Sequence, residues 1–93
     1  MVTVKVRYLA VLRGLSDCPE RSVEMDGGTL RDLLGKLLRA ENEQLKSRLF
    51  GKGEARPDVL MFINGVEATL LGGSQAKLKD GDEVTLLPSV HGG

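Results

Sequence analysis

The feature that most constrains the fold of this chain is a stripe of leucines within residues 30–38. The leucines are spaced i, i+3, i+4, i+7 and i+8, a pattern that predicts an amphipathic helix with one apolar face. Thr29 stands just before the stripe and Asp32 follows three residues later, which approximates a capping box at a helix start. We therefore expect one main core helix, whose apolar face is formed by Leu30, Leu33, Leu34, Leu37 and Leu38.

Two segments before this helix alternate between apolar and polar residues, as half-buried strands do. The first is residues 2–9 and the second is residues 21–25. The short connection between them favours an antiparallel hairpin. Within that connection residues 9–15 stay fairly apolar, and residues 16–19 predict a turn.

The pattern loosens after the leucine stripe. Glu41 breaks the stripe, although Leu45, Leu49 and Phe50 resume it as a second or continued helical stretch. Residues 51–54 are rich in glycine and predict a mobile loop.

Three further signals predict strands in the second half of the chain. Residues 59–63 form a continuous apolar run of strand length, and Asn64-Gly65 directly after them favours a type I′ hairpin turn. Residues 83–87 predict the last strand. Because one main helix can cover only one face of the resulting sheet, the predicted fold class is α+β.

Length and charge exclude several classes of protein. Ninety-three residues make a single domain, and a formal net charge of zero gives no basic footprint for nucleic acid. No apolar run approaches the length of a membrane span, so we expect no membrane partner and a cytoplasmic location. With Cys18 as the one cysteine and His91 as the one histidine, the chain lacks a disulfide, a metal cluster and a nucleophile–base pair. We therefore expect that it is not an enzyme.

The C-terminus carries the strongest functional signal. Pro88 ends an apolar run, and residues 89–93 follow it and finish in Gly92-Gly93. Two glycines leave the terminal carboxylate sterically open and allow the backbone to lie in a narrow channel. We expect a single domain in residues 1–88 and a flexible tail in residues 89–93, whose terminal carboxylate is the substrate of a partner.

Motifs in residues 62–65, 78–84 and 87–93 together resemble the ubiquitin-like sulfur carriers, and above all the small subunit of molybdopterin synthase. This subunit is also called molybdopterin-converting factor subunit 1. The shared features are an Asn-Gly turn, an Asp-Gly-Asp turn and a terminal Gly-Gly in this order. The resemblance implies a β-grasp fold: a mixed sheet with one main helix on one face, and the first and last strands parallel near the centre.

The resemblance also implies a mechanism centred on Gly93. An E1-like adenylating enzyme joins the terminal carboxylate to AMP at the expense of ATP, and the chain itself binds no cofactor. Sulfur from a cysteine desulfurase or rhodanese-type donor then gives a thiocarboxylate, which the molybdopterin synthase large subunit uses. Val90, His91 and Gly92 occupy the partner's channel.

A partner of this kind needs a docking surface on the sheet. Phe62 and Leu87 lie in runs that place apolar side chains on both faces, although the helix covers only one. We therefore predict an exposed apolar patch that includes at least one of them, on the face away from the helix.

The tail and one loop leave other functions open. Family members often end in Phe-Pro-Pro-Val-Ser-Gly-Gly, whereas this chain has Leu87, Ser89 and His91 at the variant positions. Residues 47–51 and the loop after them also resemble the archaeal ubiquitin-like small modifier proteins, whose tails are joined to lysines of other proteins. The alternatives are therefore such a protein modifier, or a non-covalent interaction domain whose Gly-Gly end is accidental.

Overall fold

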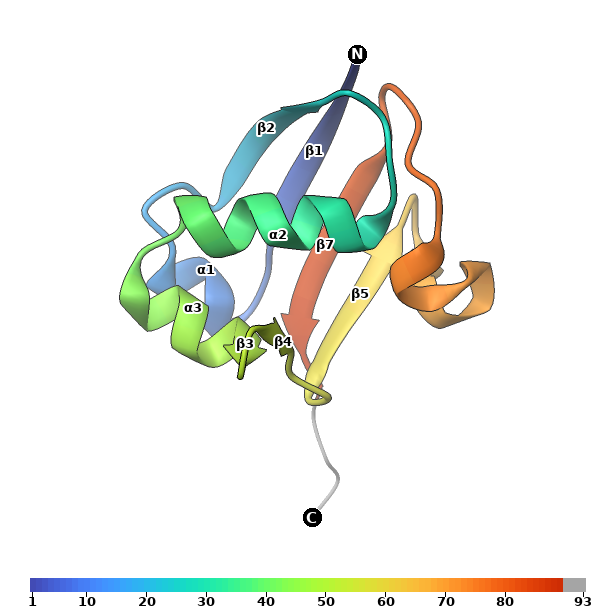
Figure 1. The fold of residues 1–93 in the computed structure, drawn as a ribbon. Coiled ribbons are helices and arrows are strands. Elements are labelled where there is room, and N and C mark those ends of the chain that lie inside the picture. Colours follow the sequence, from blue (N-terminus) through green and yellow to red (C-terminus); the bar gives the residue numbers. More distant parts are fainter. Residues whose placement is uncertain (90–93) are drawn as a thin grey trace.

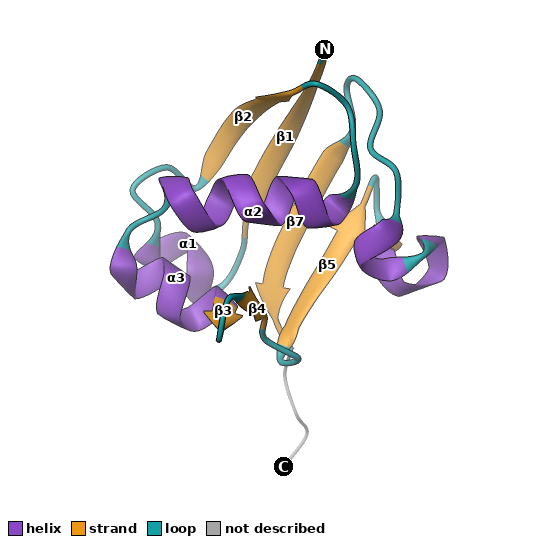
Figure 2. Ribbon diagram, in the orientation of Figure 1, coloured by secondary structure: helices purple, strands orange, loops and turns teal. Residues whose placement is uncertain are grey.

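The computed structural model describes residues 1–89, which form one mixed sheet with helices against one face (Figures 1 and 2). The sheet has five strands in the order β2-β1-β7-β5-β6. Their bounds are β1 (Val2–Tyr8), β2 (Glu20–Met25), β5 (Val59–Ile63), β6 (Val66–Glu67) and β7 (Glu83–Pro88).

The centre of the sheet is the parallel pair of β1 and β7, as the resemblance implied. β2 pairs with β1 in antiparallel register, with Val4 opposite Val23, which confirms the predicted hairpin. β5 lies antiparallel on the other side of β7. The Asn64-Gly65 turn between β5 and β6 has φ of 51° and 83° at its two residues, as a type I′ turn requires.

The main helix, α2 (Leu30–Ala40), begins with the predicted capping box. The N–H of Thr29 donates to Oδ2 of Asp32 at 2.9 Å, and the N–H of Asp32 donates to Oγ1 of Thr29 at 3.4 Å. Of the five leucines in the stripe, Leu30, Leu33 and Leu37 are buried, while Leu34 and Leu38 are half-buried and pack against the core. The predicted phase of the helix is therefore confirmed.

The core lies between α2 and one face of the sheet. Val4, Val6 and Tyr8 from β1 are fully buried, as are Val84 and Leu86 from β7. Two short helices, α1 (Val11–Leu15) and α3 (Glu43–Leu49), close one end of this core, and Figure 1 shows them side by side below α2. α3 confirms the helical stretch predicted around Leu45 and Leu49, whereas Phe50 lies just beyond the end of this helix; all three are buried.

Three elements differ from the sequence prediction. Residues 11–15 form a helix, where a connection was expected, because Leu12 inserts fully into the core. Residues 51–54 belong to a hairpin of β3 (Phe50–Gly51) and β4 (Glu54–Ala55), with Lys52 and Gly53 both at positive φ. Two 3-10 turns, η1 (Ala68–Leu71) and η2 (Gly73–Gln75), follow β6 in a stretch for which the sequence predicted no helix. None of the helices in residues 1–89 is long and apolar enough to cross a membrane.

Candidate functional site

The tail leaves the sheet at the end of its central strand. Pro88 is opposite Val59 in the β5–β7 ladder, and the N–H of Ser89 donates to the carbonyl of Asp58 at 2.8 Å. Ser89, the first residue of the expected tail, is thus fastened to the sheet. Residues 90–93, which include the predicted tail residues Val90, His91, Gly92 and Gly93, lie outside the described residues, so their roles stay predictions.

Two arginines hold the backbone segment that anchors this exit. Nε and Nη2 of Arg56 each lie 3.2 Å from a carboxylate oxygen of Asp58, and Nη1 of Arg48 lies 3.3 Å from Oδ2. The N–H of Arg56 donates to the carbonyl of Leu49 at 2.8 Å, which ties the segment to the end of α3. Partial burial alone raises the pKa of the Asp58 carboxyl, but Arg48 and Arg56 outweigh it and hold that pKa below its usual range.

An apolar cluster lies on the face of the sheet away from α2, next to the tail exit. Phe62 and Leu87, the two predicted docking residues, are both half-buried. Leu60 is directly opposite Leu87 in the ladder, and Phe62 lies two residues further along β5, so the three side chains share one face. We call Leu60, Phe62 and Leu87 the outer apolar cluster. The structure thus brings the two predicted residues together and adds Leu60, whereas their role in docking stays a prediction.

The other half of this face is charged. Nη1 of Arg7 on β1 lies 3.1 Å from Oε1 of Glu83 on β7, and its Nε lies 3.7 Å from Oε1 of Glu20 on β2. Nζ of Lys5 lies 3.9 Å from the same Glu20 oxygen. An apolar patch with charged groups beside it has the composition of a protein–protein interface, in which the charged groups lie at the rim.

The described residues contain little reactive chemistry. No group of three or more His, Cys, Asp or Glu side chains in residues 1–89 is placed to hold a metal ion. The thiol of Cys18 is half-buried in the loop before β2, with Sγ 3.1 Å from the carbonyl oxygen of Glu20. What this part of the chain presents is the outer apolar cluster beside an anchored tail exit.

Sequence reasoning missed a buried polar contact beneath the sheet. Glu41, which was expected only to break the leucine stripe, is 6% exposed and accepts a hydrogen bond from the Tyr8 hydroxyl. Its other oxygen lies 2.7 Å from Nη2 of Arg21. Burial, together with the hydrogen bond to Glu41, raises the pKa of the Tyr8 hydroxyl well above its usual range. The signal in the sequence is that Glu41 continues the spacing of the stripe, four residues after Leu37.

The profile of the ThiS family matches residues 6–93 of the chain. Small archaeal modifier protein 3 of Haloferax volcanii is 41% identical over 68 residues, which are 73% of this chain and 73% of the relative. A candidate sulfur carrier protein of Archaeoglobus fulgidus is 31% identical over 65 residues, which are 70% of this chain and 74% of the relative.

Solved structures show the same fold. Small archaeal modifier protein 1 of Haloferax volcanii superposes with a TM-score of 0.82 at 30% identity, covering 98% of this chain and 99% of that one. A candidate molybdopterin converting factor subunit 1 of Pyrococcus furiosus has a TM-score of 0.72 at 33% identity, covering 97% and 100%. A chain in the BexX/CysO complex of Amycolatopsis orientalis has a TM-score of 0.71 at 30% identity, covering 97% and 99%. These likenesses confirm the predicted ubiquitin-like β-grasp fold.

Proposed function

The chain belongs to the ThiS family of small ubiquitin-like carrier proteins, and we propose that it carries sulfur for molybdopterin biosynthesis as a thiocarboxylate on Gly93. The observation that supports this most is the place of the tail exit. Ser89 is fastened beside Asp58 at the end of the central strand, and Leu87 of the outer apolar cluster stands two residues before it. A partner that docks on the cluster therefore meets the start of the tail directly.

The chemistry requires activation by that partner. A C-terminal carboxylate has a pKa of about 3.5, so it is ionised at neutral pH and is a poor electrophile. An E1-like adenylating enzyme joins the Gly93 carboxylate to AMP from ATP, and pyrophosphate leaves. The persulfide of a cysteine desulfurase or rhodanese-type donor then attacks the adenylate and AMP leaves, and a thiol cleaves the resulting acyl disulfide to release the thiocarboxylate. The molybdopterin synthase large subunit transfers this sulfur to the pterin precursor.

The described residues contribute position rather than reactivity. The four residues after Ser89 span roughly 13–14 Å when extended, so the reacting carboxylate works within that radius of a fixed point. The hydrogen bond from Ser89 to Asp58, with Arg48 and Arg56 behind it, keeps that point on the sheet. Fixing the start of the tail in this way reduces the entropy that each partner must overcome.

Deletion of Gly92-Gly93 tests the proposal, with ATP–pyrophosphate exchange by the cognate activating enzyme as the assay. The deletion withdraws the carboxylate by roughly 7 Å, so we expect exchange to be abolished. His91→Ser changes the tail without changing its length, so it should retain exchange, with binding weakened only if the His91 ring docks on the partner. Full exchange activity from the shortened chain would remove the basis of the proposal.

Phe62→Asp tests the docking surface separately from the tail. An aspartate in the outer apolar cluster must be desolvated when a partner covers it, so we expect KM for the carrier to rise about tenfold or more. Ser22→Asp introduces the same charge on the same face of the sheet, at exposed β2, and should leave KM nearly unchanged. Equal effects of the two substitutions would show that the cluster is not where the activating enzyme binds.

A second candidate function is that of a ubiquitin-like protein modifier. The observation that favours it is the 41% identity to small archaeal modifier protein 3. In this function an isopeptide bond joins the carboxylate of Gly93 to lysines of other proteins. Mass spectrometry of native cell extracts separates the two functions: an oxygen-to-sulfur exchange on Gly93 supports the carrier, and Gly-Gly remnants on foreign lysines support the modifier. The absence of both would favour a non-covalent interaction domain.

A further inference from the structure

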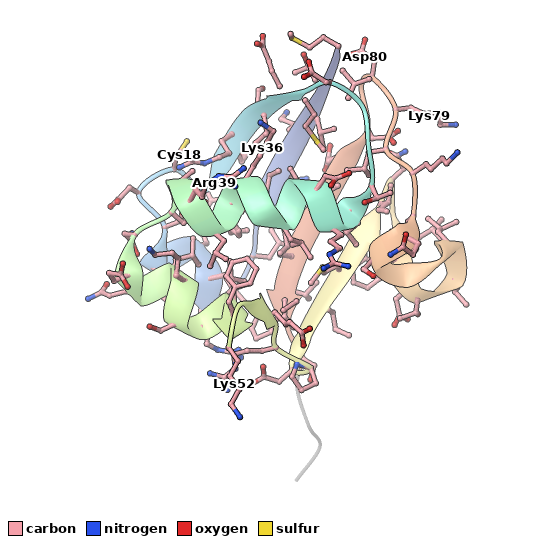
Figure 3. The ribbon with its side chains drawn as sticks, in the orientation of Figure 1. Cys18, Lys36, Arg39, Lys52, Lys79 and Asp80 are labelled. Carbon is pink, nitrogen blue, oxygen red and sulfur yellow. The ribbon has the colours of Figure 1, made fainter. Side chains whose placement is uncertain are left out.

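A groove of about 370 Å³ runs between β2 and α2, at the opposite edge of the sheet from β5. Val23 from β2 forms its apolar part and is half-buried, and Leu37 of α2 lies fully buried beneath it. Lys36 and Arg39 also line it, and Figure 3 shows both extending from α2 on the side of β2. The groove therefore combines an apolar floor with a basic wall.

The outer edge of β2 borders this groove. β2 is the outermost strand of the sheet, so within residues 1–89 no strand covers its free edge. The N–H of Tyr8 donates to the carbonyl of Pro19, and hydrogen-bonding direction alternates along an antiparallel pair. Residues 21, 23 and 25 therefore face β1, whereas Ser22 and Glu24 direct their N–H and C=O groups away from the sheet. Such an edge accepts a further strand.

The charge of the groove is positive. Arg21 also lines it, but its Nη2 is paired with the buried carboxylate of Glu41 at 2.7 Å. Lys36 and Arg39, by contrast, form no ion pair with any residue in the described part of the chain. Glu24 is the one acidic residue in the lining, and its side chain belongs to the other face of the sheet because it is opposite Thr3.

We propose that this groove binds an extended acidic peptide segment of a partner protein, which adds to the free edge of β2 as a sixth strand. The outward N–H and C=O groups of Ser22 and Glu24 need a partner with the repeat of an extended backbone. Alternate side chains of the added strand point into the groove. Apolar ones there contact Val23, and acidic ones pair with Lys36 and Arg39.

This site is separate from the outer apolar cluster. The groove opens on the α2 side of β2, whereas Leu60, Phe62 and Leu87 lie on the other face of β5 and β7. Two strands, β1 and β7, stand between β2 and β5. One protein can therefore hold the chain at β2 while another works on its tail.

Titration of the isotope-labelled full-length chain with the peptide Val-Thr-Asp-Thr-Val-Thr-Asp, in which valine and aspartate lie on the same face of an extended strand, tests the inference by NMR. The expected result is that amide shifts concentrate at Ser22, Val23 and Glu24 and along α2, with slower amide exchange at Ser22 and Glu24. A control peptide with asparagine in place of aspartate should bind more weakly. No shift at millimolar peptide, shifts at Phe62 instead, or equal binding of the two peptides would each overturn the proposal.

Substitutions test the two halves of the argument separately. Lys36→Ala and Arg39→Ala should each weaken binding about twofold to fivefold, as loss of a surface ion pair does. Lys79→Ala removes the same charge at an exposed site far from the groove, as Figure 3 shows, and should have no effect. Equal weakening by Lys79→Ala would overturn the assigned role of the basic wall.

Ser22→Pro tests the strand addition because it removes an outward N–H without breaking a bond to β1. Ser22→Ala keeps that N–H and is the matched control. We expect binding to be lost only in the proline variant, with both variants shown to be folded by their thermal melts. Unchanged binding by folded Ser22→Pro would overturn addition at this edge.

Discussion

The buried contact among Tyr8, Arg21 and Glu41 gives a stability prediction whose size follows from the structure. Glu41→Ala leaves the hydroxyl of Tyr8 without a partner in a fully buried site, which costs about 1–3 kcal/mol. It also leaves Arg21 without its carboxylate, but the Arg21 side chain is 24% exposed and can be rehydrated. We therefore expect a loss of about 2–4 kcal/mol, somewhat below the 3–5 kcal/mol of a fully buried ion pair.

Tyr8→Phe removes the donor of the same hydrogen bond and keeps its acceptor, Glu41. The Glu41 carboxylate keeps Arg21 as its partner, so the expected loss is about 1.5–3 kcal/mol, the value of a hydrogen bond to a charged group. Because both substitutions break the same bond, the double variant should lose about 1–2 kcal/mol less than the sum of the two. A domain of 93 residues has a free energy of unfolding of roughly 5–14 kcal/mol, so both single variants should remain folded.

Urea denaturation followed by circular dichroism measures these losses as shifts of the midpoint at constant slope. Glu43→Ala is the matched control, because Glu43 is exposed and pairs only with Lys46 on the surface of α3. That variant should stay within about 1 kcal/mol of the unmodified chain. A loss below about 1 kcal/mol for Glu41→Ala, or strict additivity in the double variant, would refute the buried contact.

The other predictions concern the core and the response to pH. Leu37→Ala should lower the free energy of unfolding, measured by urea denaturation, by about 3–4 kcal/mol because Leu37 is fully buried. Leu34→Ala should lower it by about 1–2 kcal/mol because Leu34 lines open grooves, and equal losses would contradict this packing. Because the pKa of Tyr8 is raised in the fold, its hydroxyl contributes fully to stability below about pH 10, and this contribution is lost as pH rises further. Tyr8→Phe should therefore flatten the alkaline limb of a curve of unfolding free energy against pH. Because the pKa of Asp58 is lowered in the fold, its carboxylate contributes to stability above about pH 3.9, and this contribution is lost as pH falls through the folded pKa. Asp58→Asn should therefore flatten the acid limb, and an unchanged limb would argue against its arginine contacts.

The parts of the fold that can be predicted from sequence are those whose signals are local. The alternation in β1 and the leucine stripe of α2 identify these elements without knowledge of their neighbours. The Asn64-Gly65 turn is equally local, since both residues tolerate positive φ. The helix α1 was missed because its five residues show no period, and it is held by the insertion of Leu12, with Leu15 packed beside it, into a core built by other elements.

The site was predicted only in part for the same reason. Residues 59–63 are all apolar, so the sequence does not say which of them face α2. Register with β7 decides this: Val59 and Ile63 are buried, while Leu60 and Phe62 join Leu87 on the other face. The partner of Glu41 likewise stands 33 residues earlier in the chain, beyond the reach of any helical pattern.

The central position of β7 has a mechanical consequence for anything joined to the tail. β7 is hydrogen-bonded to β1 through residues 83–86 and to β5 through residues 84–88. A force pulling on the chain beyond Ser89 acts along this strand, so it loads the bonds on both sides in shear and at the same time. An edge strand pulled across its ladder would instead lose its bonds one after another. The domain should therefore stay folded under tension applied through its C-terminus, and a machine that unfolds it from that end would meet its greatest resistance at the first step.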